Sequence, residues 1–183
     1  GKYACMQVNT WKKQPSRYKI TTAKAFNEKR TSNFAPAFMT EDADALIFTS
    51  NRQEKSTDKK KKVIRTSPVT GAPTFNLYAA RKNAAGEWSD IELCQGLYEE
   101  APETEEGNAQ KKTGSAELGV CCFSPDGRTM YFTYSCPING QDLGAKIYTS
   151  TRASGEWGEG QELKLFNDSS ITVGHPSLNA TGD

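Results

Sequence analysis

A short motif that pairs a tyrosine with a tryptophan recurs three times in this chain of 183 residues. The copies run from Tyr3 to Trp11, from Tyr78 to Trp88 and from Tyr148 to Trp157, and the last two share the tripeptide Gly-Glu-Trp. The tryptophans are 77 and 69 residues apart. Such a spacing indicates a repeat architecture, in which each unit buries its apolar face against its neighbours.

A second motif lies between the copies of the first. Phe34–Phe38 leads into the run Ala45–Arg52, and Gly119–Phe123 leads into Thr129–Thr133. A third copy begins at Gly174–Leu178. The two motifs alternate along the chain, which predicts that each repeat contains two different hairpins.

The chemistry of one connection predicts a tight turn. Ser124–Gly127 reads Ser-Pro-Asp-Gly, in which proline presets one φ angle and glycine accepts a positive one. The neighbouring runs Leu46–Thr49 and Met130–Thr133 are rich in aromatic and β-prone residues, as in strands that are buried on both faces. Because no segment sustains a helical period, we expect the chain to be nearly all β.

Each repeat is therefore predicted to form four antiparallel strands, the unit of a β-propeller blade. We expect about two and a half blades, an incomplete ring, because propellers have 4–8 blades. The missing blades would come from a longer protein or from another chain. The predicted ranges are 1–25 for the second half of one blade, 26–96 for a blade with an insertion at 53–73, 97–167 for a blade with an insertion at 97–116, and 168–183 for the first strand of a following blade.

Charge and hydropathy exclude some function classes. The 23 Lys and Arg nearly balance the 22 Asp and Glu, giving a formal charge of +1. A balanced charge predicts no field that would capture nucleic acid or an anionic membrane surface. No run approaches the roughly 20 apolar residues of a membrane-spanning helix.

The cysteines do not form a recognisable site. Their odd number and the lack of a Cys-x-x-Cys spacing argue against a zinc site and a dense disulfide framework. Cys121 and Cys136 are predicted on neighbouring strands and could pair in an oxidising compartment, although buried free thiols are the favoured interpretation. The five residues are Cys5, Cys94, Cys121, Cys122 and Cys136.

The segments Phe34–Arg52 and Phe123–Phe132 resemble the WD40-like repeats of the PD40 type that are known from TolB propellers. The order of Phe-Thr-Ser-Asn-Arg, Leu-Tyr, Gly-Glu-Trp and Ser-Pro-Asp-Gly is most similar to periplasmic lipoproteins in which a propeller precedes an OmpA-like domain. This resemblance covers nearly all of the chain. It implies an outer-membrane-associated periplasmic protein of the type IX secretion or gliding apparatus. Peptidoglycan would be bound only through a domain that these residues do not contain.

His175, the only histidine, is the first candidate for a catalytic residue. It lies at the start of a repeat strand, where Ala35 and the neighbours of Val120 stand in the other copies, so a structural or incidental role is favoured over a general base. A single histidine excludes a site with several histidine ligands, and no Gly-x-Ser-x-Gly motif supplies a serine nucleophile. We therefore predict no catalytic, cofactor-binding or metal-binding residues, and the residues that bind a partner stay unknown.

Two charged loops and two tryptophans are further candidates. The basic run Lys59–Lys62 and an acidic cluster are interpreted as solvated loops, because the acidic spacing lacks the form of a calcium loop. Trp88 and Trp157 are interpreted as packing residues, since carbohydrate-stacking residues need not recur in every blade. The acidic cluster consists of Glu99, Glu100, Glu103, Glu105 and Glu106.

The predicted function is a non-catalytic scaffold that binds other proteins of the cell envelope. The insertions at 53–73 and 97–116, together with the mouth of the propeller channel, are where we expect a specific surface. Two alternatives remain open: the gating propeller of a prolyl-peptidase-like hydrolase, and a TolB-like translocation partner that binds an extended peptide.

Overall fold

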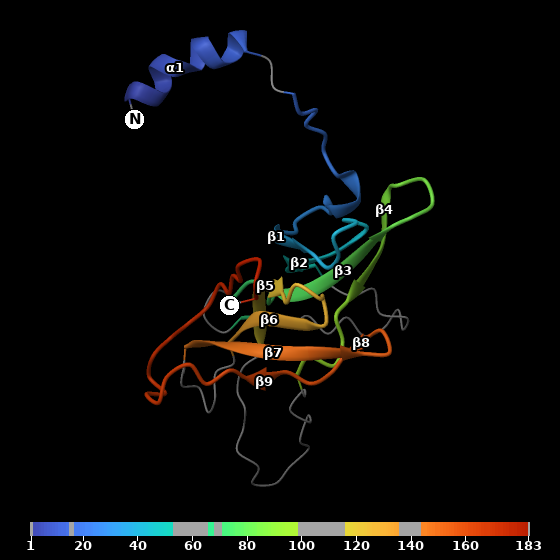
Figure 1. Ribbon diagram of the computed structural model, residues 1–183, viewed down its shortest axis with the longest axis vertical. Coiled ribbons are helices and arrows are strands. Elements are labelled where there is room, and N and C mark those ends of the chain that lie inside the picture. The colour runs from blue at the N-terminus through green and yellow to red at the C-terminus, as the bar shows by residue number, and fades with distance from the viewer. Residues whose placement is uncertain are drawn as a thin grey trace.

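The computed structural model describes residues 2–14, 17–52, 66–67, 71–98, 116–135 and 144–182. Two antiparallel β-sheets form the body, and one α-helix stands apart from them (Figure 1). The prediction of a mostly β chain is confirmed.

The first sheet consists of four strands in chain order. These are β1 (Asn33–Phe38), β2 (Ala45–Ser50), β3 (Asn76–Lys82) and β4 (Trp88–Leu93), each antiparallel to the next. A short 3-10 helix, η1 (Lys24–Phe26), precedes the sheet. All six residues of β2 are buried, which explains why its sequence begins with four apolar residues in a row, Ala45–Phe48, rather than alternating with polar ones.

The second sheet repeats this order. Its strands are β5 (Glu117–Phe123), β6 (Thr129–Ser135) and β7 (Ala145–Ala153), followed by β8 (Glu156–Trp157) and β9 (Gln161–Glu162). Both β8 and β9 pair with β7. Together these two short strands occupy the place that β4 has in the first sheet.

The N-terminal segment differs from the prediction. Residues 1–25 were expected to form the second half of a blade, but Lys2–Lys13 forms the helix α1, none of whose residues is buried. This copy lacks the Gly-Glu-Trp turn, and no other strand of the described chain lies beside it. A two-stranded hairpin without a sheet to join is marginal in water, so the helical preference of the local sequence prevails.

The core lies between the two sheets. Ile47 and Leu77 from the first sheet meet Leu118, Met130 and Phe132 from the second in one buried cluster. A second, smaller cluster covers the other face of the first sheet, where Leu46, Phe48, Tyr78 and Ala80 pack beneath Phe26 and Trp88. The first sheet is thus covered on both faces.

The first strands of both sheets share an irregularity. The register shifts between Phe34 and Ala37 in β1 and between Gly119 and Cys121 in β5. Within each shift one residue has a positive φ, 49° at Ala35 and 20° at Val120, and His175 has 56°. Bulges of this kind re-aim a strand and increase its twist. A positive φ is thus shared by Ala35, Val120 and His175, although the sequence aligned His175 only with Ala35 and with the neighbours of Val120.

The turn that follows each first strand is also repeated. The N–H of Gly127 donates a hydrogen bond to the Ser124 carbonyl at 2.8 Å, which confirms the predicted Ser-Pro-Asp-Gly turn. The N–H of Ala43 donates to the Thr40 carbonyl at 3.2 Å in the first unit. Residues 179–182 form the same turn, and all three end on a residue with positive φ.

Candidate functional site

A shallow cavity of about 210 Å³ lies beside the N-terminal half of β5. Its wall combines residues from both sheets with a residue of the segment that follows the second sheet. The lining residues are Phe34, Phe75, Glu117, Leu118, Gly119, Val120, Thr133, Ser135 and His175.

Two hydrogen bonds hold the backbone at this cavity. The N–H of Val120 donates to the Thr49 hydroxyl oxygen at 3.1 Å, and the N–H of His175 donates to the Thr133 hydroxyl oxygen at 2.9 Å. Thr49 and Thr133 hold equivalent positions in β2 and β6, each directly after a phenylalanine. Thr49 thus binds the bulged strand β5, and the equivalent Thr133 binds the segment at His175, where the predicted first strand of a following blade is not formed in the described residues. We call this contact the threonine link.

The chemistry of the cavity is mixed. Phe34 and Phe75 meet edge to face, with ring centroids 5.2 Å apart, and form an apolar wall. Glu117 and Ser135 are opposite each other in the β5–β6 register and bring a carboxylate and a hydroxyl to the same place. Such a wall suits an apolar group that carries a hydrogen-bond donor.

His175 lies at this cavity and is exposed. Its backbone N–H makes the bond to Thr133, and its structural or incidental role stays a prediction. Among the described residues no group of three or more His, Cys, Asp and Glu side chains could hold a metal ion.

Both predicted packing tryptophans stack against the end of a first strand. Trp88 stacks on Phe38 with centroids 6.4 Å apart, and Trp157 stacks on Phe123 at 5.8 Å. A cation lies over each indole, the Lys82 amine at 5.1 Å from the Trp88 ring and the Arg152 guanidinium at 5.8 Å from the Trp157 ring. Repetition of the whole trio agrees with the interpretation that these side chains pack the sheets.

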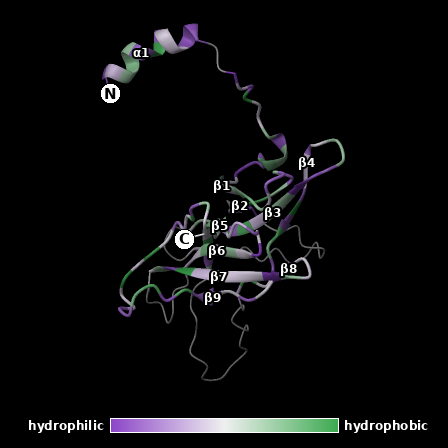
Figure 2. Ribbon diagram, viewed as in Figure 1, coloured by the Kyte–Doolittle hydropathy of each residue, from purple (hydrophilic) through white to green (hydrophobic). Residues whose placement is uncertain are grey.

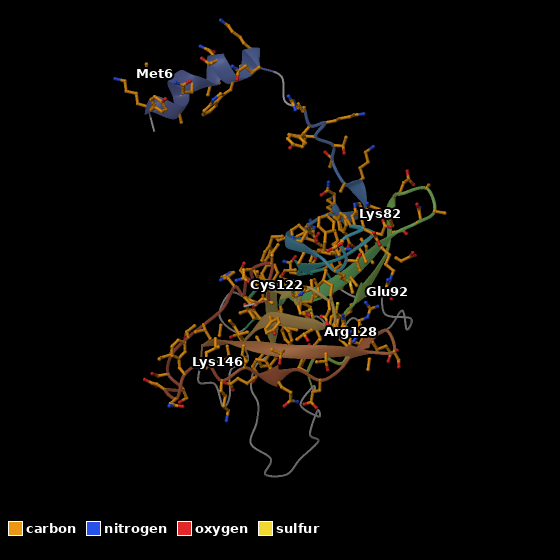
Figure 3. All side chains as sticks on the ribbon, in the orientation of Figure 1. Met6, Lys82, Glu92, Cys122, Arg128 and Lys146 are labelled. Carbon is orange, nitrogen blue, oxygen red and sulfur yellow. The ribbon has the colours of Figure 1, made fainter. Side chains whose placement is uncertain are left out.

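The described cysteines are free thiols. Burial between the sheets raises the pKa of Cys94 to about 12 and raises that of Cys121 as well. Cys122, labelled in Figure 3, is half-buried, and desolvation raises its pKa too. Cys136 lies outside the described residues, and so does any pairing with Cys121.

The charged loops of the two insertions fall largely outside the described residues. This applies to Lys59–Lys62 and to all five glutamates of the acidic cluster. The ends of the second insertion are described: Leu97 and Ala116 are both buried in the core between the sheets. The Gly160 N–H donates to the Leu97 carbonyl at 2.9 Å. Both ends of this insertion are therefore fixed in the body of the protein.

Arg52, which follows β2 closely in the chain, has no role assigned from the sequence. Its guanidinium lies 4.9 Å from the Phe48 ring and donates hydrogen bonds to the Phe26 carbonyl and the Asn33 side chain. Desolvation lowers its pKa. Arg52 thereby fastens the segment around η1 over the outer face of the first sheet. Its place at the end of a buried strand was the only available signal.

The cavity itself was also missed, because Phe75 and Glu117 belong to no motif. Their contribution depends on two sheets meeting, which local sequence does not encode. Only the general expectation of a surface near the channel mouth pointed towards this region.

Comparison with protein-family models, with curated proteins and with solved structures finds no match to this chain. In the described part of the chain, no helix is long and apolar enough to span a membrane.

Proposed function

We propose that this chain is part of a WD40-like β-propeller that serves as a non-catalytic, protein-binding scaffold in the cell envelope. The observation that carries the proposal is the threonine link, which joins Thr49 to Val120 and Thr133 to His175. One contact made twice, each time between a unit and its successor, is what an array of equivalent blades requires.

The way in which the sheets pack supports the same architecture. Phe132 of β6 packs towards the first sheet, whereas the equivalent Phe48 of β2 faces away from the second sheet. The first sheet thus presents one face to the second sheet and the other to the segment around Phe26, while the outer face of the second sheet meets the segment at His175. A contact between two different faces can repeat, and it closes into a ring when the rotation allows. The two sheets would be neighbouring blades among four to eight.

The segment after the second sheet continues the pattern. The Val173 N–H donates to the Ala145 carbonyl at 2.9 Å, and Gly174 lies against Thr133. The turn glycines behave alike: Gly127 approaches Met39 of the first unit, and Gly182 approaches Pro125 of the second. These contacts support a third unit that begins as the second one does.

The scaffold role draws on the cavity and on the resemblance of the repeats. The bulged first strands of successive units meet at the cavity, which would lie at the mouth of the propeller channel. Its partners would be proteins of a secretion or gliding apparatus in the periplasm, near the outer membrane. Attachment to peptidoglycan would come from an OmpA-like domain outside these residues.

A TolB-like role in binding an extended peptide is the second candidate, and the cavity is the observation that favours it. A peptide could place an apolar side chain against Phe34 and Phe75 and a donor against Glu117. The two candidates differ in whether the bound partner is folded or extended.

Site-specific photo-crosslinking in the source cells would test the proposal. A photoreactive residue replaces His175 in the full-length protein, and the control variant carries it at Ala85, in the exposed turn between β3 and β4. We expect a defined crosslinked product in the envelope fraction from position 175 only. Equal products from both positions, or a protein found only in the soluble fraction, would overturn the scaffold. Labelling of the same polypeptide by a serine-hydrolase probe would favour the peptidase alternative.

A further inference from the structure

The near-neutral charge of the whole chain conceals an uneven distribution. Residues 1–30 contain eight Lys and Arg and a single acidic residue, Glu28. The other 153 residues contain fifteen basic and twenty-one acidic residues. The chain is thus a basic N-terminal arm, residues 2–30, joined to an acidic body. The positive electrostatic field that the net charge of the whole chain does not predict is therefore expected around the arm.

The helix α1 of this arm has two unlike faces. At 100° per residue, Tyr3, Ala4, Val8 and Trp11 fall on one side of the helix, together with the polar Gln7. The lysines at 2, 12 and 13 fall on the other side, together with Cys5 and Met6. Figure 2 shows the mixture of hydrophilic and hydrophobic residues along α1. This pattern is typical of helices that lie at a boundary between water and an apolar phase.

The apolar face of α1 is uncovered. Tyr3 is 76% exposed and Trp11 is 56% exposed, and no residue of the helix is buried. Figure 1 shows α1 standing well away from both sheets. Met6, labelled in Figure 3, lies on the other side of the helix and is also exposed. An isolated helix of twelve residues is marginal in water, so a surface that takes up its apolar face would stabilise it.

The chain that follows α1 has the same chemistry. Tyr18 is 84% exposed and Ile20 is 93% exposed, and they alternate with Arg17 and Lys19. Lys24 continues the basic character. Exposed aromatic and aliphatic side chains that are interleaved with cations match the interface of a bilayer, where amphipathic rings and basic groups both find partners.

We propose that the N-terminal arm binds an anionic phospholipid surface. α1 would lie in the plane of the headgroups, with Tyr3, Val8 and Trp11 turned towards the acyl chains. Lys12 and Lys13 would remain at the level of the phosphates. The aliphatic residues Val8 and Ile20 favour lipid over nucleic acid, since bases stack on aromatic rings and gain little from branched aliphatic groups.

The test is sedimentation of the intact chain with vesicles at about 0.1 M salt. We expect binding to phosphatidylcholine vesicles that contain phosphatidylglycerol, at least roughly tenfold stronger than binding to pure phosphatidylcholine. A basic side chain near such a surface contributes about 1 kcal/mol, which corresponds to about fivefold in the partition coefficient. The double variant Lys12→Glu with Lys13→Glu should therefore lose at least roughly 25-fold, and Trp11→Ser should also weaken binding.

The matched control makes the same change in net charge, but in the body rather than in α1. Arg128→Glu with Lys164→Glu alters two exposed basic residues of the body and should leave vesicle binding within about twofold. Since α1 has no buried residue and Arg128 and Lys164 are both exposed, both double variants should unfold at the same denaturant concentration as the parent chain.

Four results would overturn the proposal: no binding to anionic vesicles, equal binding to neutral ones, an equal loss in both double variants, or tighter binding of a single-stranded oligonucleotide at the same salt. A dimer that dissociates in Trp11→Ser without vesicles would assign the apolar face to a second copy instead.

Discussion

The two sheets carry the same motifs and connections but differ in how they are covered. Every residue of β2 is buried, whereas only Met130 and Phe132 of β6 are buried. The second sheet and the segment around Phe26 cover β2 from its two sides, while in the described part of the chain the outer side of β6 meets the segment that follows residue 168. Burial in this repeat is therefore provided by the neighbours of a unit rather than by the unit itself.

The largest expected difference lies between Ile47 and Tyr131, which hold equivalent positions on the two sheets. Ile47 is 0% exposed, so Ile47→Ala should lower the free energy of unfolding by about 2–5 kcal/mol. Tyr131 is half-buried, and Tyr131→Ala should cost less than half as much. Urea unfolding measures both. An equal loss at Tyr131 would mean that its face is covered in solution and would break the comparison.

The turns offer a second contrast. A Cβ at Gly127 would lie 2.8 Å from the Met39 carbonyl oxygen, and the φ of 67° disfavours any side chain. Gly127→Ala should therefore lower stability by about 2 kcal/mol or more.

Ala43 holds the equivalent place in the first unit with a φ of 53°, and it already carries a Cβ. Ala43→Gly serves as the control and should change the unfolding free energy by less than about 1 kcal/mol. A similar loss in both variants would show that the turns respond to flexibility alone.

The threonine link should differ between the units by a smaller amount. Thr49 is buried, so Thr49→Val leaves the Val120 N–H without its partner and should cost about 1–3 kcal/mol. Thr133 is half-buried, and water can replace its hydroxyl when Thr133→Val is made, at a cost of about 1 kcal/mol or less. Hydrogen exchange would locate each effect, because each variant should exchange faster than the parent chain at the amide whose acceptor it removes, Val120 for Thr49→Val and His175 for Thr133→Val. If both variants instead raised the exchange rate mainly at His175, the assignment would be contradicted.

The smallest effect concerns pH. Burial raises the pKa of Cys94 from 9.0 to about 12, so the folded state keeps a proton that the unfolded state releases. The stabilisation from this neutral thiol is complete below pH 9 and is lost as pH rises from 9 towards 12.

Unfolding at pH 8 and pH 10 should therefore differ by roughly 1 kcal/mol through this thiol. Cys94→Ala should remove that part of the difference, whereas Cys5→Ala, in the exposed helix α1, should leave it unchanged. A difference between pH 8 and pH 10 that is as large in Cys94→Ala as in the parent chain would assign the effect to other groups, such as Cys121, whose pKa burial also raises.

The repeat motifs were enough to predict the strands, because their signals are local. Aromatic and β-branched runs identified β2 and β6, and Ser-Pro-Asp-Gly identified the turn between β5 and β6. The expected hairpin at residues 1–25 was wrong, since a strand pair needs a sheet beside it and Tyr3–Trp11 has none in the described chain. Local similarity to the other copies could not reveal that missing neighbour.

By itself, the sequence determined that the chain is mostly β, that its units repeat, and which tryptophans mark each unit. Only the tertiary structure decided which faces of the sheets are covered and where the first strands meet Phe75 and Glu117. It also decided that the basic residues of α1 lie on a helix that packs against neither sheet. The physical reason is range. Turn and strand preferences act over a few residues, whereas burial and the cavity depend on side chains such as Thr49 and Val120 that are 71 positions apart in the chain.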